Sequence, residues 1–522
     1  MLTARRRAFH RDLGAIPLHP LFAAAYPVVF LFATNAVEQL TLAPLWLPLV
    51  ISVGCAAIIL VALGLLTRNW LASGLVTTVL VVSFFGYGHA WNAVSGALDS
   101  QWPLIIAWMA LTSVALFFAS GARARAPMLT RVLNVVTGFL LVLNIWGLGT
   151  SMIAIGALGQ PARAVSPIDL APADTGDLPD VYYIIVDRYG GSTALAETYG
   201  FDNEPFLNAL EERGFAVARH AHANYIKTPL SVVSSLDMEY LDAEALKAEA
   251  TDGSDRGPIQ RRLGQHRVVP TALKELGYSY YQLGNWWTPT QTNVDADRVF
   301  RYQGQDEFSS VLLQTTLMRA LSDPHAAPDD PWDWSEMRAN NLYALDRLED
   351  ITSLPGPKYV FAHLVTTHPP YVHNVDGSMT GRAQVARLGD IESYVRQLQY
   401  ANTRLLGIMD AIVANDPDAV IMLQADEGPF PERYDADDWA FRWSDATDAE
   451  VEQKFGILYA MRVPGADVEA AGLRDDSTPV NAFRIIFNAR FGTDLEILPD
   501  HVYAHTDLRH FYDFIDLTDR VQ

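Results

Sequence analysis

Five apolar stretches in the first 160 residues constrain this chain more than any other feature. A helix needs about 20 consecutive apolar residues to cross the hydrocarbon core of a bilayer. Stretches of roughly this length cover Pro20–Ala36, Pro44–Leu66, Leu71–Trp91, Trp102–Ala119 and Val132–Leu158. The sequence therefore predicts an N-terminal bundle of five transmembrane helices. The first stretch can also be interpreted as a cleaved signal peptide, but no small-residue cleavage site follows it and four more apolar stretches do.

Arginine residues alternate between the two ends of these stretches. Three polar segments carry them: Arg5, Arg6, Arg7 and Arg11 before the first stretch, Arg68 after the second, and Arg123, Arg125 and Arg131 after the fourth. The other two connections, Val37–Ala43 and Asn92–Gln101, contain no Lys or Arg. Because basic loops stay in the cytoplasm, we expect a multi-pass protein of the plasma (inner) membrane, with a cytoplasmic N-terminus and an extracytoplasmic C-terminal part.

The composition divides the chain at the same place. The whole chain has 38 Lys/Arg and 60 Asp/Glu, of which the first 160 residues hold only eight and three. The remainder is strongly acidic, which argues against nucleic acid as a partner. The segment QPARAVSPIDLAPADTGDLPD reads as a tether. We therefore expect a transmembrane domain over 1–158, a linker over 159–178 and a soluble domain over 179–522. The single cysteine, Cys55, allows no intrachain disulfide.

The soluble part alternates between strand and helix patterns. Apolar runs that predict buried strands occur in DVYYIIVDRYGG, at Tyr278–Leu283, in PGPKYVFAHLVTTHPPY and at Asp418–Leu423, and FAVARHAHANY predicts a further strand. Helical patterns cover Glu204–Gly214, Pro270–Gly277 and Ile391–Ala414. This alternation predicts an α/β domain with a mostly parallel central sheet. Ligands bind beyond the carboxyl ends of strands in such sheets, where Asp187, His368, Asp426 and Glu427 fall.

Four segments resemble a known family when they are taken in order: VDRYGG, NYIKTPLSVVSSLDMEYL, FAHLVTTHPPYV and VIMLQADEGP. Their order is similar to that in the sulfatase-like branch of the alkaline phosphatase superfamily. The closer likeness is to membrane-anchored members such as lipoteichoic acid synthases and phosphoethanolamine transferases. The resemblance covers about residues 180–500 and the membrane layout, and it implies an alkaline phosphatase-like fold.

The resemblance also implies roles for individual residues. Asp187 would be the first metal ligand, and Thr228 the nucleophile and a further ligand. Asp426 and Glu427 would complete the metal shell, and His368 would contact the substrate or the leaving group. A threonine hydroxyl needs such activation because it is a poor nucleophile alone. Ser231 and Ser234 remain alternative nucleophiles.

The chain departs from the family at Glu427. Members usually read Asp-His-Gly where this chain reads Asp426-Glu427-Gly428. A shell of oxygen atoms alone suits Mn²⁺, Mg²⁺ or Ca²⁺ better than Zn²⁺, which remains possible. Three carboxylates around one divalent ion also call for a compensating cation, and Lys227 and Arg188 are the candidates. The alternative is a site that has lost its activity and only binds.

The remaining candidates are aromatic and imidazole side chains. Trp286 and Trp287 would line the substrate site as a sugar-stacking wall, although tryptophans more often pack in a core. His363 lies within an apolar run, which favours a core histidine over a functional one. Asn285 is a weaker candidate.

The combined expectation is a membrane-anchored, metal-dependent transferase or hydrolase of the phosphoglycerol or phosphoethanolamine type. Its partners would be a membrane lipid, a lipid-linked donor or an envelope glycan. A sulfate- or phosphate-ester hydrolase of the same fold is an alternative, although Lys227–Ser231 lacks the Cys/Ser-x-Pro-x-Arg arrangement of sulfatases. A catalytically silent, glycan-binding assembly protein is another. The sequence does not indicate an oligomeric state.

Fusions to a reporter enzyme test the predicted topology. A phosphatase reporter that is active only outside the cytoplasm should be active after Gln160 and at the C-terminus, and inactive at Arg123. An active reporter at Arg123, or an inactive one at the C-terminus, would contradict the topology and the envelope substrate with it.

Overall fold

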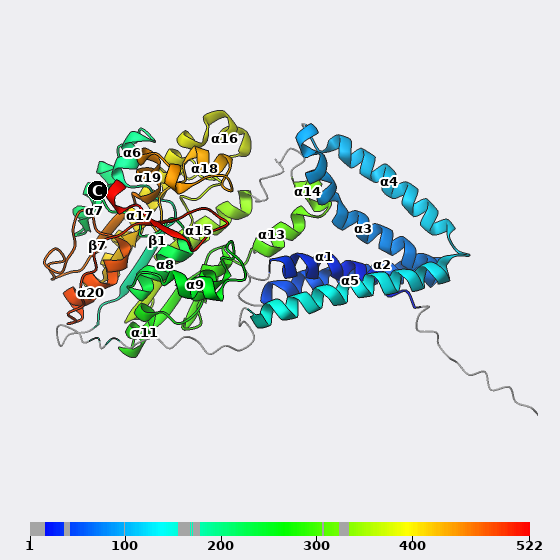
Figure 1. The fold of residues 1–522 in the computed structure, drawn as a ribbon, viewed down its shortest axis with the longest axis horizontal. Coiled ribbons are helices and arrows are strands. Elements are labelled where there is room, and N and C mark those ends of the chain that lie inside the picture. The colour runs from blue at the N-terminus through cyan, green and yellow to red at the C-terminus, as the bar shows by residue number, and fades with distance from the viewer. Residues whose placement is uncertain are drawn as a thin grey trace, which may run out of the picture. The chain divides into compact units, whose positions relative to one another are not determined.

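The computed structural model describes residues 16–35, 42–98, 100–154, 168, 170, 178–304, 307–322 and 334–521. The chain forms two compact units (Figure 1). The first comprises Met1–Gly159 and Asp306–Asp333, and the second comprises Gln160–Gln305 and Trp334–Gln522. The predicted linker lies almost entirely outside the described residues.

Five apolar helices make up most of the first unit. They are α1 (His19–Thr34), α2 (Ala43–Thr67), α3 (Trp70–Val94), α4 (Trp102–Gly121) and α5 (Ala126–Ala154). The last four are long and apolar enough to cross a membrane, and α1 is a shorter apolar helix. The chain is therefore a membrane protein. The helix α5 begins six residues before the predicted Val132, and residues 36 and 155–158 of the predicted spans lie outside the described part.

Hydrogen bonds from polar side chains tie these helices together. Asn134 of α5 accepts from the backbone N–H groups of Leu18 and His19 at 3.0 and 2.7 Å, and so caps the start of α1. The His19 ring lies 2.6 Å from the Thr78 hydroxyl of α3, and Ser52 of α2 donates to the Ala24 carbonyl at 2.7 Å. Such bonds matter in a bundle because lipid tails are as apolar as the helix surfaces, so burial of apolar side chains does not by itself favour helix–helix contacts over helix–lipid contacts.

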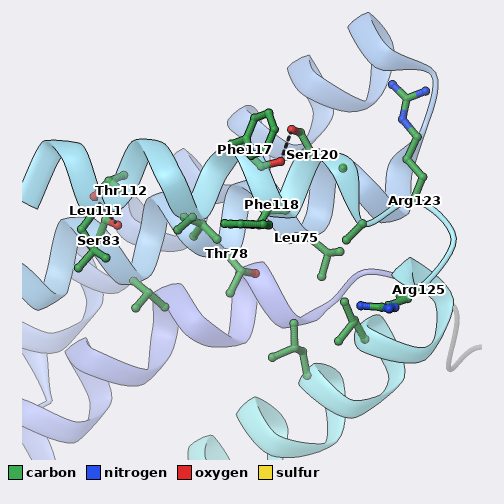
Figure 2. A pocket seen from close by; sticks show the side chains of 18 of the residues that line it. Leu75, Thr78, Ser83, Leu111, Thr112, Phe117, Phe118, Ser120, Arg123 and Arg125 are labelled. Atoms are coloured by element: carbon green, nitrogen blue, oxygen red, sulfur yellow. Dashed lines mark hydrogen bonds between the residues drawn. The ribbon is translucent and has the colours of Figure 1, made fainter.

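The chain enters the first unit a second time through α13 (Glu307–Gln314) and α14 (Met318–Ser322). Phe308 packs edge-on against Phe32 of α1, with ring centroids 5.1 Å apart. The Gly88 N–H donates to the Thr315 carbonyl at 3.0 Å, and a Cβ at Gly88 would lie 2.1 Å from the backbone of Gln314. We expected residues 179–522 to form one soluble domain, but residues 306–333 belong to the first unit. The same unit has an open groove of about 1150 Å³ among α3, α4 and α5 (Figure 2).

A seven-stranded sheet forms the centre of the second unit. Its order is β2 (Ala216–Val217), β7 (Tyr459–Arg462), β6 (Val420–Gln424), β1 (Val181–Val186), β5 (Lys358–Leu364), β3 (Ser279–Leu283) and β4 (Arg298–Phe300). The strands from β6 to β4 are parallel, whereas β7 and β2 pair antiparallel. This confirms the predicted α/β domain with a mostly parallel sheet.

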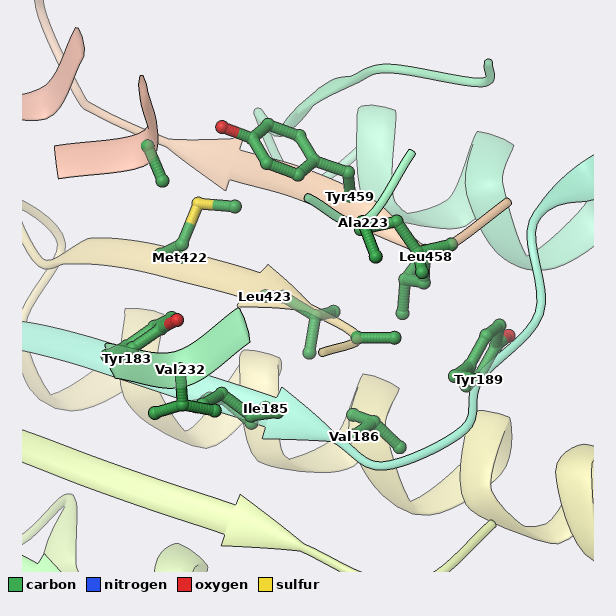
Figure 3. Close-up of a cluster of buried hydrophobic side chains, with 14 of the residues drawn as sticks. Tyr183, Ile185, Val186, Tyr189, Ala223, Val232, Met422, Leu423, Leu458 and Tyr459 are labelled. Atoms are coloured by element: carbon green, nitrogen blue, oxygen red, sulfur yellow. The ribbon is translucent and has the colours of Figure 1, made fainter. Parts of the chain in front are cut away.

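Helices bury the sheet, so that every residue of β1, β5 and β6 is buried. The longer ones are α8 (Thr228–Asp237), α11 (Val268–Glu275), α15 (Trp334–Ile351), α17 (Asp390–Asn415) and α20 (Ala482–Arg490). Side chains of β1, β6 and α8 interleave in the core (Figure 3). The shorter elements are α6 (Ser192–Glu197), α7 (Glu204–Glu211), α9 (Ala243–Glu249), α10 (Gly257–Leu263), α12 (Thr288–Gln291), α16 (Arg382–Leu388), α18 (Glu432–Ala436), α19 (Asp448–Phe455), β8 (Tyr503–His505) and β9 (Phe514–Asp516).

Most predicted elements of this unit are present within a few residues of their expected bounds. The exception is FAVARHAHANY, of which only Ala216–Val217 forms a strand. Beyond it the chain makes single bridges, from His222 to Gly456 and from Tyr225 to Tyr503. The segment reads like a strand because its alternate residues are apolar, but it borders the sheet and does not extend it.

A buried ion pair between Asp180 and Lys358 holds the starts of β1 and β5 together. The Asp180 carboxylate also accepts from the Lys358 backbone N–H at 3.1 Å. Replacing Asp180 with Ala leaves the Lys358 ammonium buried without its counter-ion, so we expect a loss of about 3–5 kcal/mol of unfolding free energy. The measurement is urea unfolding of the full chain in detergent, followed by tryptophan fluorescence.

The matched control is Asp410→Ala, which removes an exposed ion pair with Arg213. Such pairs contribute about 1 kcal/mol or less. Equal losses for the two variants would contradict the special role of the buried pair.

Candidate functional site

Three neighbouring parallel strands end at the same edge of the sheet. In the register, Ile185 of β1 lies opposite both His363 of β5 and Gln424 of β6. Asp187 follows the end of β1 directly, and Asp426 comes two residues after β6. Because β6, β1 and β5 are adjacent, their carboxyl ends bring these side chains together.

Asp187, His363 and Asp426 form a buried group whose potential ligand atoms all lie within 4.8 Å of one another. The His363 Nε2 is 3.4 Å from the Asp187 Oδ2. The other Asp187 oxygen and both Asp426 oxygens have no hydrogen-bond partner among the residues that the structure describes. Buried carboxylate oxygens without donors are costly, so this group fits a bound cation.

His363 is buried, as a core histidine would be, but its ring also belongs to this group and so becomes a candidate ligand. Its Nδ1 lies 3.0 Å from the side-chain amide nitrogen of Asn285 and 3.1 Å from the Thr290 hydroxyl. The Asn285 amide is held in turn by the Trp287 backbone N–H at 2.8 Å. These contacts fix the ring so that Nε2 faces the carboxylates. Asn285, a weak candidate from sequence, positions this ring.

Glu427 lies beside this group but pairs with cations. Its Oε1 is 3.1 Å from the Lys454 ammonium and 3.6 Å from the Arg188 guanidinium. Gly428 and Lys454 hold each other through two bonds, N–H to carbonyl at 2.8 Å and ammonium to carbonyl at 2.7 Å. A Cβ at Gly428 would lie 2.4 Å from the Gln453 carbonyl, so this close approach requires glycine. The Glu427 Oε2 is buried without a donor among the described residues.

Thr228 opens the helix α8, with Lys227 as an extended N-cap residue and Pro229 in the first turn. The positive end of the helix dipole therefore lies at the Thr228 hydroxyl. Ser231 and Ser234, the alternative nucleophiles, are buried and donate to the carbonyls of Tyr225 and Glu239 at 2.9 and 2.7 Å. Both hydroxyls are thus already engaged within the fold.

A cavity of about 150 Å³ brings the predicted residues together. Its lining consists of Asp187, Arg188, Lys227, Thr228, Pro229, Arg256, Gln260, Trp286, Trp287, Val365, His368, Glu427 and Phe511. All the predicted site residues except the deeper Asp426 are among them. Arg256, Gln260 and Phe511 were missed, because they come from segments without a motif. Trp286 lines the cavity and contacts the His368 ring edge-on, with ring centroids 5.7 Å apart.

The pKa values of several groups at the site are shifted far from their ordinary values. Burial, with the neighbouring carboxylates of Asp187 and Glu427, raises the pKa of Asp426 to about 7. Burial lowers the pKa of the Lys227 ammonium well below its ordinary value, and nearby cations add to this effect. Burial and the charge of Arg188 lower the pKa of His368 to about 3, so this ring is neutral at pH 7. Such perturbed groups in one cavity are typical of a functional site.

Comparison with known proteins finds similarity only to solved structures, and at low sequence identity. No family model matches the chain, and no curated protein matches it. Among solved structures, the integral membrane lipooligosaccharide phosphoethanolamine transferase A of Neisseria meningitidis is similar at 11% identity and a TM-score of 0.39, over 90% of this chain and 95% of that one. The C-terminal periplasmic domain of EptC from Escherichia coli gives 13% and 0.40 over 68% and 96%.

A putative sulfatase from Bacteroides thetaiotaomicron gives 11% identity and a TM-score of 0.37, over 63% of this chain and 78% of that one. These neighbours are of the kinds named by the sequence resemblance to the sulfatase-like branch of the alkaline phosphatase superfamily. TM-scores at this level carry no argument about the reaction, which has to be argued from the chain's own residues.

The metal content of purified variants tests the group. We expect His363→Ala and Asp426→Asn to lower the affinity for a divalent ion at least about tenfold, since each removes one ligand atom. Metal content after dialysis against a buffered metal is measured by mass spectrometry. Asp435→Asn, an exposed carboxylate on α18, serves as the control. Full metal content in His363→Ala, with loss in Glu427→Gln, would instead support the predicted shell that contains Glu427.

Proposed function

We propose that this chain is a membrane-anchored, metal-dependent enzyme that transfers or hydrolyses a phosphoryl group of an envelope lipid or glycan, with Thr228 as the nucleophile. The observation that supports it best is the position of the Thr228 hydroxyl: it lines the same cavity as Asp187, beside the buried Asp187–His363–Asp426 group. The domain that contains this cavity would lie outside the cytoplasm, close to lipid-linked substrates.

Asp187, His363, Asp426 and Thr228 would hold the ion, and Glu427 contributes charge from beside them. A shell of one nitrogen and several oxygens suits Zn²⁺ or Mn²⁺. The sequence favoured Mg²⁺ or Ca²⁺ because every expected ligand atom was an oxygen, and the His363 nitrogen weakens that argument. When bound, the ion lowers the pKa of a ligating hydroxyl and offsets charge on a phosphoryl oxygen.

The protein residues account for the rest of the reaction. The Thr228 oxygen bonds to phosphorus as the bond to the leaving oxygen breaks. The Thr228 hydroxyl gives its proton to solvent water, and the leaving oxygen takes a proton from solvent water. Water or an acceptor hydroxyl then displaces Thr228. The His368 Nδ1 donates to the Pro369 carbonyl, so Nε2 of this neutral ring is free to accept the proton of the incoming hydroxyl. Arg188 and Lys227 stabilise the phosphoryl oxygens.

Substitution of Thr228 tests the proposal. Thr228→Ala should lower turnover of bis(p-nitrophenyl) phosphate by about 10³-fold or more, because the covalent step is lost. Its folding cost should stay near 1 kcal/mol. Activity of the full chain in detergent and the mass of the Thr228 peptide after incubation with membrane lipid are the two measurements.

Ser231→Ala is the control, because its hydroxyl is bound to the Tyr225 carbonyl. Turnover that survives in Thr228→Ala but falls in Ser231→Ala would move the nucleophile one turn along α8. A wild-type chain that binds a divalent ion but shows neither turnover nor a modified Thr228 would favour the silent binding protein.

A further inference from the structure

Four cations lie over two aromatic rings at this site, and three of them, Arg188, Lys227 and Arg256, line the cavity. The Phe430 ring lies under three of them, with centroid distances of 3.3 Å to Lys454, 4.0 Å to Lys227 and 4.7 Å to Arg188. The fourth, Arg256, stacks on the cavity residue Phe511 at 5.4 Å. The electron-rich faces of the rings stabilise these charges but do not neutralise them.

Carboxylates balance only part of this positive charge. Glu427 pairs with Lys454 and Arg188. Asp187 and Asp426 belong to the group that fits the metal ion. Within the described part of the chain, Lys227 and Arg256 form no ion pair. Glu427 and Asp435 of α18 act on Lys227 only electrostatically. With a divalent ion set against the two aspartates, four basic side chains surround one carboxylate, which is a formal excess of three positive charges when all four are protonated.

A phosphodiester brings one negative charge into the cavity, which leaves most of this excess unbalanced. A half-buried cation without a counter-ion is costly where the dielectric constant is low. A substrate with another negative charge next to the phosphoryl group would remove that cost. A zwitterionic headgroup would instead place an ammonium beside the cations, where Asp187 faces the metal group and Glu427 already pairs with Lys454 and Arg188.

We propose that the cavity selects a phosphoester that carries a second negative charge next to the transferred phosphoryl group, held by Lys227 and Arg256. The inference rests on the proposed function and names the charge class of its substrate. A phosphomonoester on a lipid and a soluble phosphomonoester share this chemistry.

Two phosphonates that differ by one methyl group and one charge test it. Phenylphosphonate is a dianion when fully ionised, and its monomethyl ester is a monoanion. Binding of either compound requires no bond cleavage by Thr228. Their affinities for the full chain in detergent, loaded with Mn²⁺ or Zn²⁺, are measured by calorimetry. The wild type should prefer the dianion, and Arg256→Gln should reduce that preference about tenfold, the effect of losing one charged hydrogen bond.

Arg298→Gln is the matched control, since Arg298 stacks on Phe300 at 4.9 Å as an exposed residue outside the cavity lining. Arg256→Lys should retain much of the preference, which a merely structural role of Arg256 would not explain. Tighter binding of a short-chain phosphatidic acid than of phenylphosphonate would indicate that the natural substrate is a lipid phosphoester. Equal binding of the two compounds would indicate a soluble phosphoester.

A dianion preference that is unchanged in Arg256→Gln, or absent from the wild type, overturns the inference. Turnover of the phosphodiester that depends on Thr228 would then still support the proposed function. Failure of both phosphonates to bind, together with absent turnover, would overturn the two proposals together.

Discussion

The parallel pairing of β6, β1 and β5 is the constraint on which the site depends. These three strands place Asp187, His363 and Asp426 at one edge, each buried and each delivered by a different segment of the chain. Two carboxylates at such short range repel each other in a dry interior. The fold tolerates them because His363 faces Asp187, and it leaves oxygen atoms without donors where a cation fits.

A second network, of positively charged side chains, lies beside that group of carboxylates. Glu427, adjacent to Asp426, is drawn to Lys454 and Arg188 and so anchors the cations over Phe430. The reciprocal bonds between Gly428 and Lys454 bring the end of β6 and the end of α19 together. Glu427 therefore links the end of β6 to the cations beside the cavity.

The membrane unit shows a different use of close contact. Residues 307–322 leave the α/β unit and pack against α1, α2 and α3, where Gly88 allows backbone to meet backbone. Between apolar helices in lipid, such close packing and the hydrogen bonds of Asn134 and His19 supply the specificity that burial from water supplies elsewhere. The chain thus connects its two units through more than the expected single linker.

The sequence by itself determined the apolar helices, the mostly parallel sheet and the strand ends at which Asp187, Asp426 and Glu427 stand. Hydropathy and strand periodicity are local properties, so a short window carries them. Only the tertiary structure decided that His363 joins the aspartates and that Glu427 turns to Lys454. His363 looks like a core residue because its neighbours in β5 are apolar, and its place beside Asp187 appears only when β1 pairs with β5. Lys454 and Arg256 are distant in sequence from Glu427 and Thr228, which lie near them in the fold. A local sequence pattern cannot reveal such long-range contacts between charged groups.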